Sequence, residues 1–136
     1  EQMVDLMQQK LPEIELIPGV LEFIKKQYCL QFVSSAAPLA EVNEQLAFLG
    51  LAGNFRKVYA SPNYKNKALA IREVQQQYKK EVIFFGDSLS DLKYAQETGC
   101  HFFGITYCSA VFSEFESVNL LPDFRYAYDA IVKLIG

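Results

Sequence analysis

Four short apolar runs alternate with helical patterns along this chain, and the alternation constrains its fold more than any other feature. The runs cover residues 30–33, 57–60, 82–85 and 101–106, and the third, VIFF, is the most apolar. No hairpin turn signal separates one run from the next. Short apolar strands joined by helices favour right-handed crossovers and a parallel sheet covered on both faces. We therefore expect an α/β fold with a Rossmann-like, three-layer parallel sheet.

Proline, glycine and serine mark the helix ends between these strands. Pro12 ends a first short helix, Pro18 opens the second, and Pro38 and Gly50 bound the third. Ser88 or Ser90 caps a later helix that Gly99 ends. The predicted helices cover residues 2–10, 18–26, 38–49, 65–80, 90–98 and 124–135.

Charge and composition exclude several classes of partner. The formal net charge of −3 creates no general cationic field, so we expect no binding to nucleic acid and none to an anionic membrane. No apolar stretch approaches the roughly 18 residues of a membrane span, and the opening EQMVDLMQQK does not resemble a signal peptide. Cys29, Cys100 and Cys108 are far apart and form no CxxC pair, which favours thiols in a reducing compartment. We expect a cytoplasmic protein.

Two carboxylates follow the most apolar predicted strand. In GDSLSD, Asp87 comes directly after the strand and Asp91 lies about one helical turn later. The functional groups of an open α/β sheet gather where its strands end. Mg²⁺ prefers oxygen ligands and usually keeps several waters, so Asp87 is expected to bind the metal directly and Asp91 through water.

Hydroxyl and ammonium groups follow two other predicted strands. Ser34 and Ser35 come after the first strand, while Lys65 and Lys67 come after the second. A serine hydroxyl can donate a hydrogen bond to a phosphate, and a lysine supplies positive charge to a transferring phosphoryl group. Together with Asp87 these groups suit a phosphoryl-transfer pocket.

Three segments resemble motifs II, III and IV of the haloacid dehalogenase-like (HAD) superfamily: QFVSSAAP, YASPNYKNKAL and VIFFGDSLSDLKYAQETGCHFFGI. The segment PGVLEFI resembles the return from a helical cap into the core. The resemblance extends from Leu16 to Thr106, and its spacing favours Lys65 over Lys67 as the phosphate lysine. It implies hydrolysis of a phosphate ester through a phospho-aspartate, with Mg²⁺ held by the motif IV acid and the nucleophile.

The first motif of that family, a strand followed by DxDGT, does not occur in this sequence. No DxD is present, and Asp5 is the only aspartate before Ser34. In the family this motif supplies the nucleophile, the general acid and two magnesium contacts. We therefore expect residues 1–16 to be the end of a cap or a return linker, and residues 17–136 to form a core without its first strand. An upstream segment or a second chain is expected to supply that strand, unless the two neighbouring strand edges pair directly, and the 136 residues alone are expected to be inactive.

Three hypotheses for function follow. The leading one is a Mg²⁺-dependent phosphatase for a small phosphorylated metabolite, with Ser34 and Lys65 as catalytic residues. The alternative is an inactive HAD-fold module for binding or interaction. A receiver-like signalling domain is disfavoured because its paired acids would come early in the chain. The leading hypothesis predicts that Ser34, Lys65, Asp87 and Asp91 converge in one pocket.

Overall fold

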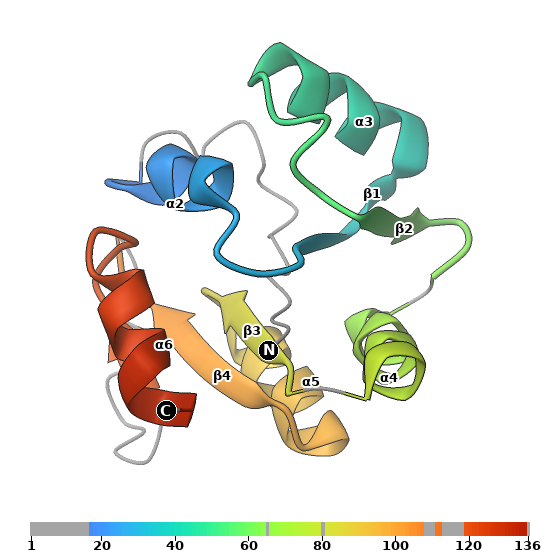
Figure 1. The fold of residues 1–136 in the computed structure, drawn as a ribbon. Helices are drawn as coiled ribbons and strands as arrows, with labels where there is room; N and C mark the ends of the chain where they lie inside the picture. The colour runs from blue at the N-terminus through green and yellow to red at the C-terminus, as the bar shows by residue number, and fades with distance from the viewer. Residues whose placement is uncertain (1–16, 65, 80, 108–110, 113–118, 136) are drawn as a thin grey trace.

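Helices and parallel strands alternate along the chain as the sequence predicts, in a computed structural model that describes residues 17–64, 66–79, 81–107, 111–112 and 119–135 (Figure 1). The predicted helix over residues 2–10 and the predicted boundary after residue 16 lie outside these ranges. The elements are α2 (Val20–Lys26), β1 (Phe32–Pro38), α3 (Leu39–Phe48), β2 (Lys57–Ser61), α4 (Lys67–Tyr78), β3 (Ile83–Gly86), α5 (Leu89–Thr98), β4 (His101–Ile105), β5 (Asn119–Leu121) and α6 (Ala127–Ile135).

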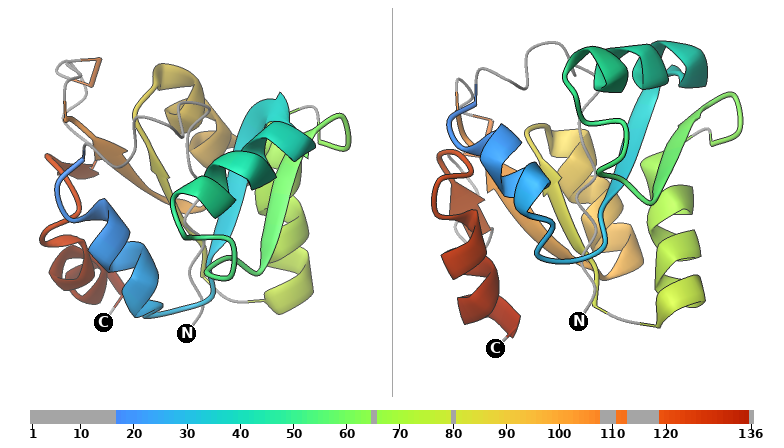
Figure 2. Two further views of the ribbon diagram at one scale, coloured as in Figure 1. Left: turned by 90° about the horizontal axis from the view of Figure 1, so that it is seen from above. Right: turned by 45° about the horizontal axis from the view of Figure 1, so that its top comes forward.

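The described strands pair as two parallel sheets. β1 pairs with β2, with Phe32 opposite Lys57 and Ser34 opposite Tyr59. The second sheet has the order β3-β4-β5, and both of its pairings are parallel. β1 lies between β2 and β3 in Figure 2 (right), but no described strand pairs with the edges of β1 and β3 that face each other. We name this gap the open slot.

Helices cover both faces of the strands, which confirms the predicted α/β class. Strand side chains alternate between two apolar clusters, as expected for buried parallel strands. On one face, side chains of β1 and β3 such as Val33 and Phe85 pack with α2, α3 and α6. On the other face, Phe32 and Phe84 of the same two strands pack with α4 and α5. Both clusters extend across the open slot, so the two sheets form one layer.

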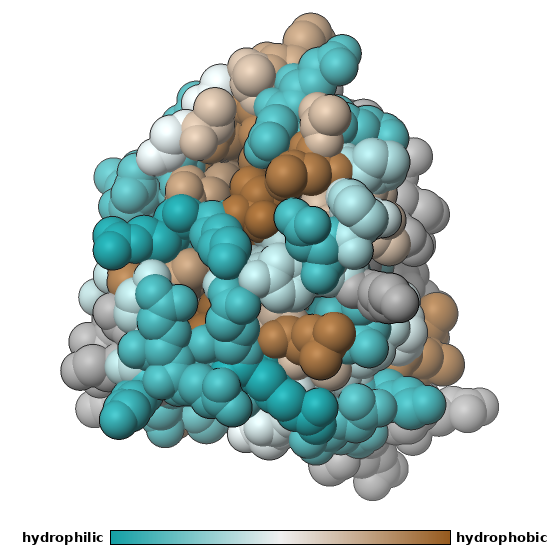
Figure 3. All heavy atoms as spheres, turned by 90° about the vertical axis from the view of Figure 1, so that its right-hand side faces the viewer, coloured by the Kyte–Doolittle hydropathy of each residue, from teal (hydrophilic) through white to brown (hydrophobic). Residues whose placement is uncertain are grey.

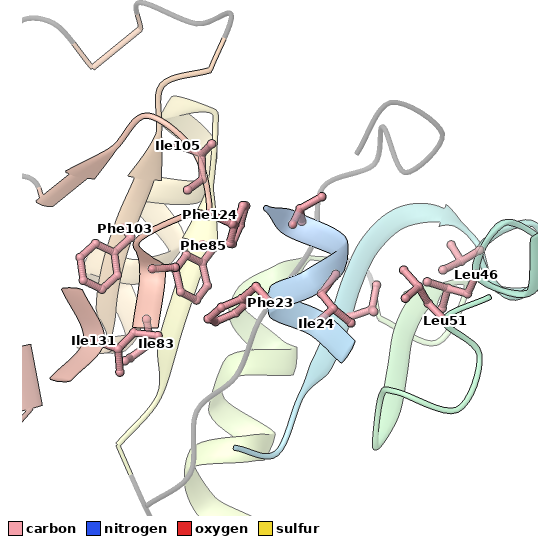
Figure 4. Close-up of a cluster of buried hydrophobic side chains, with 14 of the residues drawn as sticks. Phe23, Ile24, Leu46, Leu51, Ile83, Phe85, Phe103, Ile105, Phe124 and Ile131 are labelled. Carbon is pink, nitrogen blue, oxygen red and sulfur yellow. The ribbon is translucent and has the colours of Figure 1, made fainter. Parts of the chain in front are cut away.

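The helix α2 spans the two sheets on the first face. Figure 4 shows Phe23 directed toward the side of β3 and α6, and Ile24 directed toward Leu46 and Leu51. The ring centroid of Phe23 lies 5.7 Å from that of Phe85 and 5.5 Å from that of Phe124. Helix packing, rather than strand pairing, therefore joins the two sheets within the described residues.

Two predicted element boundaries differ from the structure by three residues or more, and one strand is missing from the prediction. β1 extends to Pro38, past the predicted end at residue 33, because Ser34 and Ser35 are themselves buried in the strand. α6 begins at Ala127 instead of residue 124, because the Asp123 carboxylate accepts a hydrogen bond from the Arg125 backbone N–H and holds a turn there. The three-residue strand β5 was not predicted, since its short, partly exposed sequence carries no strand period.

The described helices are also too short or too polar to cross a lipid bilayer.

Candidate phosphate and metal site

The start of α5 is held by a reciprocal cap between Ser88 and Asp91. The Asp91 backbone N–H donates to Ser88 Oγ at 3.3 Å, and the Ser88 backbone N–H donates to Asp91 Oδ2 at 3.3 Å. The Ser88 hydroxyl also donates to Asp91 Oδ2 at 2.8 Å. This capping box satisfies two amide groups that a helix start leaves unpaired, and it fixes the Asp91 side chain where β3 ends.

The ammonium group of Lys67 meets the other oxygen of the same carboxylate. Lys67 Nζ donates to Asp91 Oδ1 at 2.9 Å. The side chain of Lys67 is 12 % exposed and that of Asp91 is 1 % exposed, so the pair is poorly solvated. Lys67 is the first residue of α4, whose N-cap Asn66 accepts a hydrogen bond from Leu69 N–H at 3.1 Å. The starts of α4 and α5 are therefore joined by a buried ion pair.

Gly86 allows Asp91 to approach the end of β3. A Cβ atom on Gly86 would lie 2.5 Å from Asp91 Cβ and 2.7 Å from Asp91 Oδ2. Contacts this short force one of the two groups to move. Glycine is therefore required at this position by close packing against the Asp91 side chain.

We expect Gly86→Ala to destabilise the full-length protein by about 1–3 kcal/mol, because the added methyl group displaces Asp91 from Lys67 and Ser88. The measurement is urea unfolding followed by circular dichroism. Gly53→Ala is the matched control, because a Cβ there meets nothing within 4 Å and Gly53 has no positive φ angle. Equal unfolding midpoints for the two variants would show that the Asp91 side chain does not pack closely against Gly86.

Ser34 and Ser35 lie within β1 rather than after it. They are 2 % and 3 % exposed, and Ser35 Oγ accepts a hydrogen bond from the Ala37 backbone N–H at 3.1 Å. The register of β1 with β2 is irregular between Ser34 and Pro38, toward the carboxyl end of the strand. β1 and β3 run in the same direction in Figure 2 (right), so the part of β1 that follows Ser34 and the Asp87 that follows β3 lie at the same end of the strand layer.

Asp87 provides a half-buried carboxylate directly after β3. The Asp91 carboxylate is occupied by Lys67 and Ser88, so it suits an indirect role toward a metal better than direct ligation. Within the described residues, no three His, Cys, Asp or Glu side chains are grouped so that they could bind a metal ion. Mg²⁺ is commonly held by one or two carboxylates with phosphate and water, and Asp87 and Asp91 fit that chemistry.

The structure brings together only part of the predicted set. Lys67 contacts Asp91, and Asp87 follows the same strand that Asp91 packs against. Lys65 lies outside the described residues, so the preference for Lys65 and the convergence of all four side chains stay predictions.

A second polar cluster, formed by β2, α4 and the loop between them, is not predicted from the sequence. Tyr64 Oη donates to Glu73 Oε1 at 2.7 Å, and Lys57 Nζ donates to Glu73 Oε2 at 3.0 Å. Lys57 Nζ also donates to Tyr64 Oη at 3.2 Å. The hydrogen bond from Tyr64, followed by that from Lys57, lowers the pKa of Glu73. The hydrogen bonds that Lys57 donates to Tyr64 and to Glu73 raise the pKa of Lys57. We name these three residues the Tyr64 latch. Its members are 7, 9 and 16 positions apart in the chain, so no local pattern reveals it.

The lowered pKa of Glu73 predicts a loss of stability in acid. A carboxyl group whose pKa is lower in the folded state stabilises the protein above its unfolded pKa of about 4.3, and this contribution disappears as the pH falls through the folded pKa. The side chain is 38 % exposed, so the contribution is expected to be below about 1 kcal/mol. Urea unfolding should show wild type more stable than Glu73→Gln at neutral pH, with the difference shrinking as the pH falls below about 4.3. A difference that is constant over this range would contradict the assignment.

Comparison with known proteins identifies the family to which this chain belongs. The family model described as haloacid dehalogenase-like hydrolase matches residues 1–105. The chain belongs to the haloacid dehalogenase-like hydrolase family, which confirms the resemblance of its motifs. No curated protein matches the sequence.

Solved structures share the fold at low sequence identity. The core domain of a Streptococcus pneumoniae protein, assigned by prediction as a phosphoglycolate phosphatase, is 16% identical with a TM-score of 0.71; the match covers 100% of this chain and 98% of that one. A predicted phosphoglycolate phosphatase from Haemophilus somnus is 19% identical with a TM-score of 0.71, covering 85% of this chain and 56% of that one. A Thermotoga maritima protein, assigned by prediction as a β-phosphoglucomutase, is 21% identical with a TM-score of 0.67, covering 87% and 60%. The chain therefore spans little more than half the length of the last two proteins.

Proposed function

We propose that this chain is the core, after the cap, of a Mg²⁺-dependent phosphatase that acts on a small phosphorylated metabolite. The observation that carries the proposal is the buried Lys67–Asp91 pair at the end of β3, beside Asp87. Such an arrangement places positive charge and carboxylate oxygens at one end of a parallel sheet, where α/β enzymes bind phosphate. The family match supports the hydrolase class, and the proteins named above suggest phosphate esters as substrates.

Each residue has a proposed role in this site. Asp87 would hold Mg²⁺, which supplies positive charge that neutralises the phosphate, and Asp91 would contact the metal through water. Lys67 is our choice for the phosphate lysine because Asp91 orients its ammonium group; Lys65, which the family spacing favours, is the other candidate. Ser34, with Ser35 beside it, would donate a hydrogen bond to the phosphate.

The nucleophile is proposed to come from outside these 136 residues. The open slot between β1 and β3 is the place for an additional strand, because both strands are buried on their faces and each has one edge without a described partner. A strand there would end between Ser34 and Asp87. An upstream segment of the same protein, or a second chain, would supply that strand and the nucleophilic aspartate, with hydrolysis through a phospho-aspartate.

An inactive HAD-fold binding module is the second candidate, and the absence of any DxD from the sequence favours it. Such a module could keep the Lys67–Asp91 pair for stability alone. A cytoplasmic location stays a prediction under either function.

A panel of phosphate esters with Mg²⁺ tests the proposal on the full-length gene product. The panel should include phosphoglycolate and hexose phosphates, and phosphate release is the readout. We expect turnover of at least one ester that stops when the metal is chelated. Turnover of none, in a folded protein that contains the DxDGT strand, would favour the binding module.

A further inference from the structure

The loop between β2 and α4 is fastened to the molecule by Tyr64. The Tyr64 backbone N–H donates to the Ala60 carbonyl at 3.2 Å, which closes a tight turn after β2. From this turn the side chain extends to Glu73 in the middle of α4 and to Lys57 at the start of β2. One side chain therefore joins the loop, the edge strand and the helix.

The aromatic ring of Tyr59 packs against the Tyr64 latch. The ring of Tyr64 meets that of Tyr59 edge-on, with centroids 4.6 Å apart and an interplanar angle of 82°. Lys57 Nζ lies 4.8 Å from the Tyr59 centroid and 5.4 Å from the Tyr64 centroid, within the range of cation–π attraction. Burial, with a smaller effect of the Glu73 carboxylate, raises the pKa of Tyr59 and keeps this ring neutral. The Tyr64 ring thus packs against the buried ring of Tyr59.

The latch lies close to the proposed phosphate lysine along the chain. Tyr64 precedes Lys67 by three residues, and Glu73 follows Lys67 by six residues of the same helix, or about 9 Å of helix axis. On the side facing α5, Gln75 Nε2 donates to the Thr98 carbonyl at 3.0 Å and helps to hold the later turns of α4. The first turn of α4, which carries Lys67, follows directly after the loop that Tyr64 fastens.

Solvent reaches the latch on the side of the molecule that carries α3, β2 and α4. Lys57 and Glu73 are 47 % and 38 % exposed. Figure 3, which faces this side, shows a largely hydrophilic surface whose apolar atoms form separate patches. These observations favour a role for the latch in holding the loop against β2 and α4, rather than in binding another protein.

We propose that Tyr64 is a positioning residue for Lys67: through Glu73 and Lys57 it holds the start of α4 where the Lys67 ammonium group meets Asp91. Only the expected effect of Tyr64 on catalysis rests on the proposed function. The geometric effect on Lys67 can be measured without any turnover, so failure of one claim is distinguishable from failure of the other.

The test is the rate at which acetic anhydride labels Lys67 in the full-length protein, followed by peptide mass spectrometry. Loss of the hydroxyl in Tyr64→Phe should release Lys67 from its pair more often and raise its labelling rate about three- to tenfold, the factor expected for one net hydrogen bond. Lys25 and Lys26, exposed on α2, serve as internal references with unchanged rates. In an active protein, kcat should fall by a similar factor while KM changes less.

Amide hydrogen exchange in β3 distinguishes a local shift of Lys67 from a loss of overall stability. The buried amides of β3 exchange only when a larger part of the protein unfolds.

Tyr126→Phe is the matched control, because this exposed tyrosine lies just before α6, and the labelling rate of Lys67 should not change in it. If Tyr64→Phe does not fold, Glu73→Gln, which keeps the side-chain volume but removes the charge that strengthens the hydrogen bonds from Tyr64 and Lys57, should still raise the labelling of Lys67. Unchanged labelling of Lys67 in the folded variant, or a rise matched by faster exchange in β3, overturns the inference.

Discussion

Replacing Asp91 with alanine is expected to destabilise the full-length protein by about 3–5 kcal/mol, the range found when one partner of a buried ion pair is removed. Two losses combine in this variant. The ammonium group of Lys67, only 12 % exposed, loses the carboxylate 2.9 Å away, and the start of α5 loses the hydrogen bonds that the Ser88 backbone N–H and hydroxyl donate to Asp91 Oδ2. The measurement is the free energy of unfolding in urea.

Asp129→Ala is the matched control, since Asp129 is an exposed aspartate in the first turn of α6 and its loss should change stability by less than about 0.5 kcal/mol. The double variant Lys67→Met, Asp91→Ala should be more stable than Asp91→Ala alone, because the methionine buries no charge. If Asp91→Ala unfolds like Asp129→Ala, the buried pair does not form and the proposed site loses its main support.

Filling the open slot is expected to have the largest effect on stability. Buried N–H and C=O groups without partners cost roughly 1–3 kcal/mol each. Summed over a slot several residues long, this cost rivals the roughly 5–15 kcal/mol stability of an ordinary domain. We expect the 136 residues alone to be poorly stable as a monomer, and the same core with the upstream segment of its gene to be more stable by at least about 5 kcal/mol.

Urea unfolding, together with the molecular mass in solution, measures this difference. The mass is needed because a second copy could supply the strand and stabilise an oligomer instead. Cooperative unfolding of the 136-residue monomer with ordinary stability would show that the facing edges of β1 and β3 already have partners within this chain.

The sequence predicts well those features that depend on local chemistry. The strand over β3 and the stop at Gly99 follow from an apolar run and a glycine that adopts positive φ, and the structure selects Ser88 of the two serines expected as the cap. The family and the α/β class followed from the same segments and are confirmed.

Features that depend on tertiary contacts could not be predicted in the same way. The burial of Ser34 inside β1 depends on the helices packed over that strand, not on its own residues. The contact between Lys67 and Asp91 joins residues 24 positions apart, so no local pattern predicts it, and the preference for Lys65 stays a prediction. The Tyr64 latch likewise depends on how β2, its loop and α4 fold together.

The central claim is that this chain holds the metal and phosphate groups of a phosphatase while the nucleophile lies in another segment. Mg²⁺-dependent phosphate release, measured for the 136 residues alone, for the full-length gene product and for its Asp87→Asn variant, tests this claim most directly. We predict no turnover by the 136 residues, turnover by the full-length protein, and a loss of about 100-fold or more in Asp87→Asn, as expected when a major electrostatic group is removed. Turnover by the 136 residues alone that Asp87→Asn abolishes would contradict the account, because the nucleophile would then lie within this chain.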